Sequence, residues 1–439
     1  MMKNKRKQKS TFWIIILLGL LFSCVVPNVN ADFLDENSSE ILISSNVALN
    51  EEPAIGVHKG NIHIVWAMYP TEFSSVICYR KSQDNGRTWG DIYNLSSNTT
   101  KAVYPDIAVS KNKVHVVWSD YRSDNPEIFY IRSMDNGENW GSQQRLTFNS
   151  SQKNNIYDIR IKAEDSNVYV IWKDYRSGSS EIFFKKSTNN GEAWGDDQRL
   201  TTDYDPSYYP RFTVQNNKLF VVYEHRSTNY NIALIKSEDY GDSWSTKKLL
   251  TDTHTVSEKP YIAVLDDSIF LVWQEITSFN REIMFKKSTN NGDSWEDEKQ
   301  IASASYLTID PKIYVYQNKI AVIWHEQHND SFSIVYITSD DVGSNWNERR
   351  EIVSHMDCYS GEIAGEGSNL YLVWQQRHQA AWSDVWFIGN HTYSEVIDST
   401  VVNSENNNTS GFELILIFIP VVIVLITSCL YHYTKKRRC

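Results

Sequence analysis

Arginines that follow an acidic or amide side chain at the end of an apolar segment are the residues best suited to bind a ligand. Asp120-Tyr121-Arg122 and Asp174-Tyr175-Arg176 share one spacing, which Glu224-His225-Arg226 and Gln375-Gln376-Arg377 repeat. A guanidinium presents a planar fork of donors that matches a carboxylate or a sugar acid. The predicted ligand-binding residues are Asp120, Arg122, Asp174, Arg176, Glu224, Arg226 and Arg377.

The same residues have a structural interpretation. Three of these arginines follow an acid by two residues and recur in phase with a repeat. Each acid–arginine pair can therefore link neighbouring elements instead of binding a ligand, and this structural interpretation is the favoured one. In the functional interpretation Tyr104, Tyr121, Tyr175 and Tyr209 supply stacking surfaces. No metal site or cofactor is expected, because His115, His225, His325 and His328 lack ligand spacing.

A repeat of about 51 residues must position these side chains. An octet Ser-x-(Asp/Asn)-x-Gly-x-x-Trp occurs six times, and an apolar strand ending in Trp or Tyr occurs seven times. A proline precedes that strand in several copies: Pro53, Pro105, Pro210, Pro260 and Pro311. The repeated octet positions are Asp84, Gly86, Trp89; Asp135, Gly137, Trp140; Asn189, Gly191, Trp194; Asp239, Gly241, Trp244; Asn290, Gly292, Trp295; and Asp341, Gly343, Trp346.

Each repeat divides into four strand-length segments, which is typical of a β-propeller blade. The segment Ile41–Ser45 aligns with Asn94–Ser97, the fourth strand of the first repeat, so it is expected to complete the last repeat from the other end of the chain. The prediction is an all-β, seven-bladed propeller of four-stranded antiparallel blades, closed by an N-terminal strand. A six-bladed ring is the alternative.

The octets are expected to be structural. Glycine can take positive φ in the turn, and the Asp carboxylate can accept local backbone N–H groups. Asn189 and Asn290 stand in place of Asp, and an amide oxygen can accept those bonds whereas it cannot act as an acid catalyst. In a blade of this topology, the octets lie on the face opposite the mouth face, where second strands link to third strands and the chain crosses to the next blade.

These octets resemble Asp boxes, and residues ~40 to 397 resemble the sialidase (neuraminidase) superfamily of Asp-box, or BNR-repeat, propellers. The resemblance implies a substrate carboxylate held by three arginines, a Tyr–Glu nucleophile and an Asp acid. No arginine lies between Arg6 and Arg80, where the family's early arginine motif would stand. The catalytic set is therefore not recognisable, the catalytic residues stay unknown, and whether the protein is an enzyme stays open.

The two ends of the chain predict a cell-surface protein. Residues 1–31 read as a signal peptide, with a lipoprotein signal at Cys24 as a weaker alternative, 32–397 as the propeller, 398–411 as a stalk, 412–432 as a transmembrane helix and 433–439 as a basic cytoplasmic tail. The expected topology is single-pass type I with the propeller extracellular. The glycosylation sequons begin at Asn37, Asn94, Asn98, Asn149, Asn329, Asn390, Asn407 and Asn408.

Charge excludes one class of partner. The whole chain carries a net charge of −11, and the segment between the signal peptide and the membrane helix is more acidic still, so no nucleic acid partner is expected. Cys78 and Cys358 are the cysteines of that segment, and both the paired and the free state stay open.

The predicted function is binding of a glycan or protein ligand outside the cell, at the mouth face of a membrane-anchored propeller. The first alternative is an exo-acting glycosidase of the sialidase type that removes terminal sialic-acid-like sugars. The second is a structural component of the surface layer.

Overall fold

The computed structural model describes residues 39–45, 48–96, 101–123, 125–148, 156–251, 255–277, 280–303, 307–328, 331–354, 357–378 and 382–389. The predicted signal peptide, stalk, transmembrane helix and tail lie outside these residues, as do all the sequons except the one at the exposed Asn94. Within the described part of the chain, no helix has the length and apolar character needed to cross a membrane.

The protein is all-β and is built from repeated four-stranded antiparallel sheets; the described residues form no helix. In chain order the sheets are β2 (Leu49–His58), β3 (Asn61–Thr71), β4 (Ser74–Ser82), β5 (Tyr93–Asn94); β6 (Ala102–Ser110), β7 (Lys113–Asp120), β8 (Glu127–Ser133), β9 (Gln144–Arg145); β10 (Tyr157–Glu164), β11 (Asn167–Asp174), β12 (Glu181–Ser187), β13 (Gln198–Arg199); β14 (Ser207–Gln215), β15 (Lys218–Arg226), β16 (Tyr230–Ser237), β17 (Lys248–Leu249); β18 (Val256–Leu265), β19 (Ser268–Ile276), β20 (Arg281–Ser288), β21 (Lys299–Ser303); β22 (Thr308–Tyr316), β23 (Lys319–His328), β24 (Ser331–Ser339), β25 (Arg350–Val353); and β26 (Cys358–Glu366), β27 (Asn369–His378), β28 (Trp382–Gly389), with β1 (Ile41–Leu42) beside β28.

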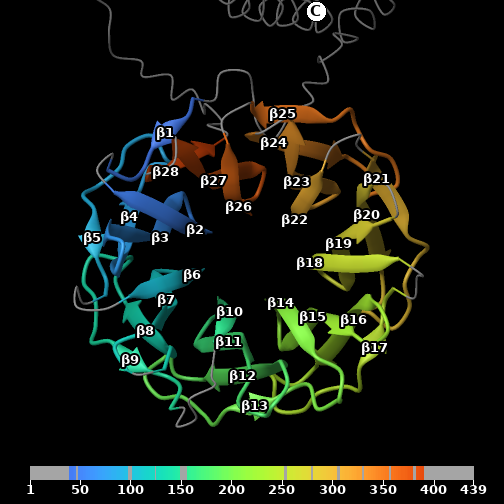
Figure 1. The fold of residues 1–439 in the computed structure, drawn as a ribbon, viewed down its shortest axis with the longest axis horizontal. Helices are drawn as coiled ribbons and strands as arrows, with labels where there is room; N and C mark the ends of the chain where they lie inside the picture. The colour runs from blue at the N-terminus through green and yellow to red at the C-terminus, as the bar shows by residue number, and fades with distance from the viewer. Residues whose placement is uncertain are drawn as a thin grey trace, which may run out of the picture. The chain divides into compact units, whose positions relative to one another are not determined.

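The first strand of each sheet lies nearest the centre of the molecule, and the later strands lie progressively farther out (Figure 1). We call β2, β6, β10, β14, β18, β22 and β26 the inner strands. The beginning and end of the described chain meet, because Ile41 pairs with Phe387 and Leu42 with Trp386. Leu49 of β2 also pairs with Ser383 of β28, which joins the first and last groups of strands into one sheet.

The core consists of apolar clusters between neighbouring sheets. The second strands continue for two to five residues beyond the recurring Trp or Tyr, which is almost completely buried, as Trp118 is between the first and second sheets and Trp172 between the second and third. These strands alternate short β-branched and aromatic residues, which fill the space between two pleated faces. The cluster around Trp66 includes Ile43 and Phe387, so side chains from both ends of the described chain share it.

Each octet forms the same hydrogen-bonded turn. In the first, the Ser82 hydroxyl accepts a bond from the Gly86 amide at 2.9 Å, and Asp84 Oδ1 accepts one from the Thr88 amide at 2.9 Å. Asn189 and Asn290 make the second bond through their amide oxygens, also at 2.9 Å. The Trp that closes the octet packs edge-on against an aromatic ring of the neighbouring sheet in five octets, as Trp140 does on Tyr79 at 4.9 Å. The octets thus stabilise turns and link adjacent sheets.

Each inner strand contains one register shift against its neighbour, which marks a β-bulge. A non-glycine residue with positive φ, between 47° and 61°, occupies every bulge: Glu52, Tyr104, Asp158, Tyr209, Lys259, Asp310 and Ser360. A left-handed conformation costs an L-residue roughly 1–2 kcal/mol, so seven equivalent instances need support from the surrounding fold. Bulges re-aim side chains, and these lie near the start of each inner strand.

Both cysteines in the described residues, Cys78 and Cys358, are free and buried. Burial raises the pKa of the Cys78 thiol to about 12, so it stays protonated at neutral pH.

Candidate functional site

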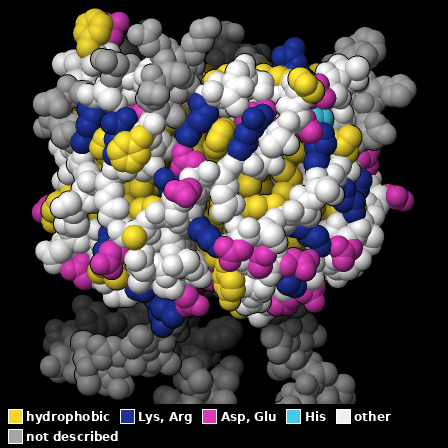
Figure 2. All heavy atoms as spheres, turned by 90° about the horizontal axis from the view of Figure 1, so that it is seen from below, with side chains coloured by type: hydrophobic (Ala, Val, Ile, Leu, Met, Phe, Trp, Pro, Cys, Tyr) yellow, Lys and Arg dark blue, Asp and Glu magenta, His cyan; other side chains and the backbone are white. Residues whose placement is uncertain are grey.

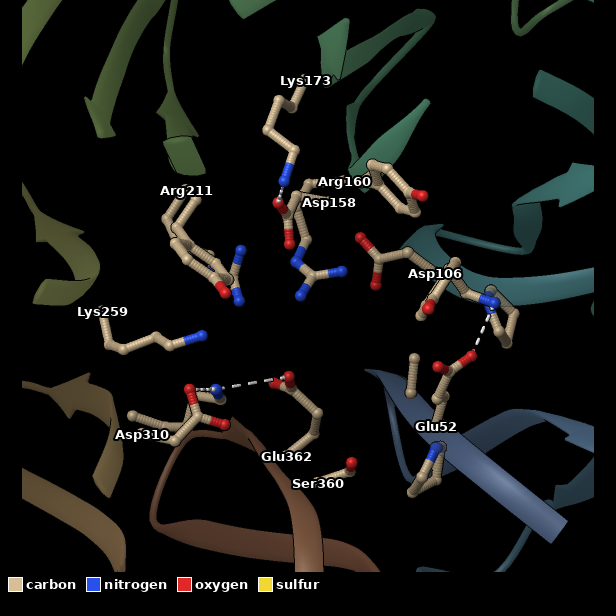
Figure 3. A pocket seen from close by; sticks show the side chains of 17 residues that line it. Glu52, Asp106, Asp158, Arg160, Lys173, Arg211, Lys259, Asp310, Ser360 and Glu362 are labelled. Carbon is tan, nitrogen blue, oxygen red and sulfur yellow. Dashed lines mark hydrogen bonds and ion pairs between the residues drawn. The ribbon is translucent and has the colours of Figure 1, made fainter. Parts of the chain in front are cut away.

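A cavity of about 430 Å³ lies among the bulges of the inner strands. Its lining residues come from all seven inner strands and from β11 (Figure 3). They are Glu52, Pro53, Ala54, Tyr104, Pro105, Asp106, Tyr157, Asp158, Arg160, Lys173, Tyr209, Arg211, Lys259, Asp310, Lys312, Ser360 and Glu362. Five are acidic and five are basic, so the cavity is polar and balanced in charge.

The repeat explains why these residues meet. In six of the inner strands, the bulge residue and the residue two positions later both line the cavity, as Asp310 and Lys312 do; in β18 only the bulge residue Lys259 does. A proline separates the two in five strands, where its missing N–H leaves no donor unsatisfied at the bulge. Ile159 and Gly361 take the proline's place in β10 and β26.

Three ion pairs neutralise part of the lining. Lys173 Nζ lies 2.9 Å from Asp158 Oδ2, and Lys312 Nζ lies 3.1 Å from Asp310 Oδ1 and 3.7 Å from Glu362 Oε1. Burial opposes ionisation of Asp158, but Lys173 and Arg211 outweigh it and hold its pKa below the ordinary value. The pKa of Asp310 is likewise depressed against burial by Lys312 and Lys259. These pairs stay charged at neutral pH and form fixed parts of the wall.

Three cations in the cavity have no such partner. Among the described residues, neither Arg160, Arg211 nor Lys259 forms an ion pair within 4.0 Å. Each arginine donates from Nη1 to the carbonyl of the residue before it, both at 2.9 Å. Figure 3 shows all three head groups pointing toward the middle of the cavity. Burial lowers the pKa of Lys259, although Asp310 and Glu224 oppose this shift.

The acids on the opposite side are held by backbone amides. Glu52 Oε2 accepts the Tyr104 amide at 2.7 Å, and Asp106 Oδ2 accepts the Ile161 amide at 2.8 Å. Burial raises the pKa of Glu52 to about 7 and also raises the pKa of Asp106. Both carboxyls therefore gain from a positive charge placed beside them.

A second cavity of about 320 Å³ continues along the inner strands toward the octet face. Small residues such as Gly56, Ala108 and Ala364 line much of it, and it shares Arg160 and Arg211 with the first cavity. In its lining the Tyr261 hydroxyl lies 3.5 Å from Glu362 Oε2. The described residues contain no cluster of three or more metal-ligating side chains.

The arginines predicted from the sequence lie elsewhere. Arg122 binds Asp120 through two side-chain bonds of 2.8 and 2.6 Å, and its guanidinium carbon stacks 4.0 Å from the centre of the Phe129 ring. Burial opposes ionisation of Asp120, but the bonds from Arg122 and Trp118 hold its pKa below the ordinary value. The pair is structurally satisfied within its own sheet.

Arg176 is engaged in the same way by two acids. Its Nη2 lies 2.5 Å from Asp174 Oδ2 and its Nη1 lies 2.6 Å from Asp197 Oδ2. Burial would lower the pKa of Arg176, but these two carboxylates raise it. Arg226 and Arg377 instead stack on Tyr230 and Tyr359, at 5.1 and 4.4 Å from the ring centres.

None of the seven predicted ligand-binding residues lines the first cavity. Glu224 contacts a lining residue directly, because its Oε1 accepts a hydrogen bond from the backbone amide of Lys259 at 2.7 Å. Burial raises the pKa of Glu224 to about 8. Of the predicted stacking residues, Tyr104 and Tyr209 do line the cavity.

The sequence reasoning missed most of the cavity's charged residues, including Asp106, Arg160, Arg211 and Lys259. The signal was present in the repeat: these residues flank the recurring proline or stand at the equivalent position. The outer surface offers no comparable guide, since Figure 2 shows basic and acidic side chains interspersed over one side of the molecule.

No protein-family model matches the sequence, and no curated protein matches it. Among solved structures, the polysaccharide lyase Uly1 aligns with a TM-score of 0.55 at 11% identity, over 79% of this chain and 91% of that one. A protein of unknown function from Dyadobacter fermentans DSM 18053 aligns at 0.51 and 11% identity, over 80% and 97%. Trypanosoma rangeli sialidase in complex with sialic acid aligns with a TM-score of 0.45 at 13% identity, over 71% of this chain and 60% of that one. The protein therefore shares an all-β, propeller-like fold with Uly1 and the Dyadobacter protein at low sequence identity.

Proposed function

We propose that the protein is a cell-surface, membrane-anchored propeller of seven blades that binds a carbohydrate ligand in the cavity at its centre. Seven blades, rather than six, are supported by the four strands β26, β27, β28 and β1, the last of which comes from the other end of the chain. The apolar run near the C-terminus and its basic tail support the anchor.

The observation that carries the proposal is the convergence of seven bulges on one polar cavity. Ten charged residues and three tyrosines among seventeen lining residues suit a ligand rich in hydroxyl groups rather than an apolar one. Polyhydroxylated sugars accept and donate hydrogen bonds to such groups while a tyrosine ring packs against a sugar face. Uly1, which shares the fold, is by name a polysaccharide lyase, and a carbohydrate is the ligand class proposed here.

Binding of the purified full-length protein, kept in detergent, to a glycan array tests this function. We expect binding to a restricted set of glycans and its loss in Arg211→Gln, whose side chain lines the cavity. Arg226→Gln is the matched control because the exposed Arg226 lies outside the cavity, and it should bind as the wild type does. Equal glycan binding by both variants would show that the cavity is not the binding site. If no glycan binds at all, the structural role in the surface layer would be favoured.

An exo-acting glycosidase is a second candidate, and the Tyr261–Glu362 pair beside Arg160 and Arg211 favours it. Burial and the neighbouring Glu362 raise the pKa of Tyr261, so Glu362 would have to accept its proton before the oxygen could attack. Release of the fluorophore from a fluorogenic sialoside, abolished by Tyr261→Phe and by Glu362→Gln, is the expected result. Turnover that survives both substitutions would eliminate this pair as the nucleophile.

A further inference from the structure

The charges of the first cavity form two separate arcs around its centre. Lys173 pairs with Asp158, and Lys312 pairs with Asp310 at 3.1 Å and with Glu362 at 3.7 Å, so these charges offset one another. The remaining cations lie on the consecutive inner strands β10, β14 and β18, and the remaining acids lie on the inner strands β2 and β6. The cationic arc is Arg160, Arg211 and Lys259, and the acidic arc is Glu52 and Asp106.

The cations of the cationic arc form no ion pair among the described residues, and their hydrogen bonding is incomplete. Arg211 is only 8% exposed, and its Nε has no hydrogen-bond partner within the described residues. A guanidinium has five N–H groups, and an unsatisfied buried donor is costly. Lys259 Nζ lies 3.3 Å from the centre of the Tyr209 ring, which contributes a face but no acceptor oxygen. An anionic group placed between Arg211 and Lys259 would satisfy both.

The two carboxylates of the acidic arc have no cation within ion-pair distance among the described residues. Glu52 and Asp106 each accept one backbone amide. The lining also includes the short side chains of Ala54 and Ser360. Figure 3 places Glu52 and Asp106 across the cavity from Arg211 and Lys259.

We infer that the cavity selects a zwitterionic sugar unit, with a carboxylate bound by Arg211 and Lys259 and a protonated amine bound by Glu52 and Asp106. This rests on the proposed carbohydrate-binding function and specifies its ligand class. A neutral sugar would leave both arcs unmatched, and a sugar with one charge would leave one arc unmatched. A sugar that carries both charges matches the cavity from side to side.

Titration calorimetry with four sugars of one parent skeleton tests the inference: glucose, glucuronic acid, glucosamine and 2-amino-2-deoxyglucuronic acid. With the full-length protein in detergent, we expect the last to bind at least about tenfold more tightly than either singly charged sugar. N-acetylation of its amine should remove this advantage. If glucuronic acid binds as tightly as the amino acid sugar, the inference fails while carbohydrate binding stands. If none of the four binds and the glycan array is also negative, both fail.

Two variants should separate the arcs. Glu52→Gln is expected to abolish the tenfold advantage of the amine while preserving the preference for glucuronic acid over glucose, and Lys259→Met should have the reverse effect. Lys111→Gln removes an exposed cation that does not line the cavity and is the matched control. Thermal melts establish that each variant is folded. An amine advantage that is unchanged in folded Glu52→Gln would overturn the assignment of the acidic arc.

Discussion

Glu224 shows how burial affects a single carboxyl next to the site. It is 1% exposed and its pKa is raised to about 8, against an ordinary value of 4.5. Between these pH values the folded state keeps the proton while the unfolded state has released it, so this residue makes stability fall as pH rises from about 4.5 to about 8. Above pH 8 the folded protein must hold a buried carboxylate.

Glu224→Gln should therefore be more stable than the wild type at alkaline pH. The amide oxygen can still accept the Lys259 amide, and the variant avoids an ionisation cost of about 1–3 kcal/mol at pH 8. Urea denaturation at pH 5 and pH 8 measures the difference, which should be small at pH 5 and largest at pH 8. A constant difference at both pH values would contradict the assigned titration.

For the Lys173–Asp158 pair we expect removal of one charged group to destabilise the protein, because the two opposite charges are buried together. Lys173→Met leaves the Asp158 carboxylate without its cation and should lower the free energy of unfolding by about 3–5 kcal/mol. The double variant Lys173→Met/Asp158→Asn should recover a large part of that loss, because the uncompensated charge is gone. A double variant no more stable than the single one would show that packing, rather than charge, causes the loss.

At the scale of the element, the octet turn depends on an acceptor rather than on a negative charge. Asp84 Oδ1 accepts the Thr88 amide, and asparagine makes the same bond in two other octets. Asp84→Ala should cost about 1 kcal/mol, whereas Asp84→Asn should cost clearly less. Chemical denaturation of both variants measures this. Equal losses would mean that the charge itself stabilises the turn.

The repeat allowed the four-stranded sheets to be predicted from the sequence, because octet, Trp-ended strand and proline recur at nearly constant spacing. The site was harder to predict. Asp120-x-Arg122 has the residue types of a binding site, yet its two side chains satisfy each other, and sequence spacing cannot distinguish a paired arginine from an unpaired one. Arg211 and Lys259 belong to the cavity because bulges turn them inward, and no single residue type marks a bulge when the left-handed position is Glu, Tyr, Asp, Lys or Ser.

At the scale of the whole molecule, seven residues at the start of the described chain connect its two ends. The Ile43 amide donates to the Val385 carbonyl at 2.8 Å, and Arg80 Nη1 donates to the Ile43 carbonyl at 2.8 Å. The Ile43 side chain is completely buried in the cluster shared by the first and last sheets. If this segment closes a ring, its loss should weaken the entire molecule rather than one sheet.

Ile43→Ala should consequently lower the free energy of unfolding by about 2–4 kcal/mol while unfolding remains a single transition. The reason is that the cavity left by Ile43 lies between strands from both ends of the chain, so no sheet can open there without breaking the connection. Tryptophan fluorescence and far-UV circular dichroism should report the same lowered midpoint, since buried tryptophans are distributed through the sheets. Ile41→Ala is the matched control, because Ile41 is only partly buried, and it should cost less. Two separated transitions in the Ile43 variant would indicate that the ends can part while the remaining sheets stay folded, which is the behaviour of an open array of repeats.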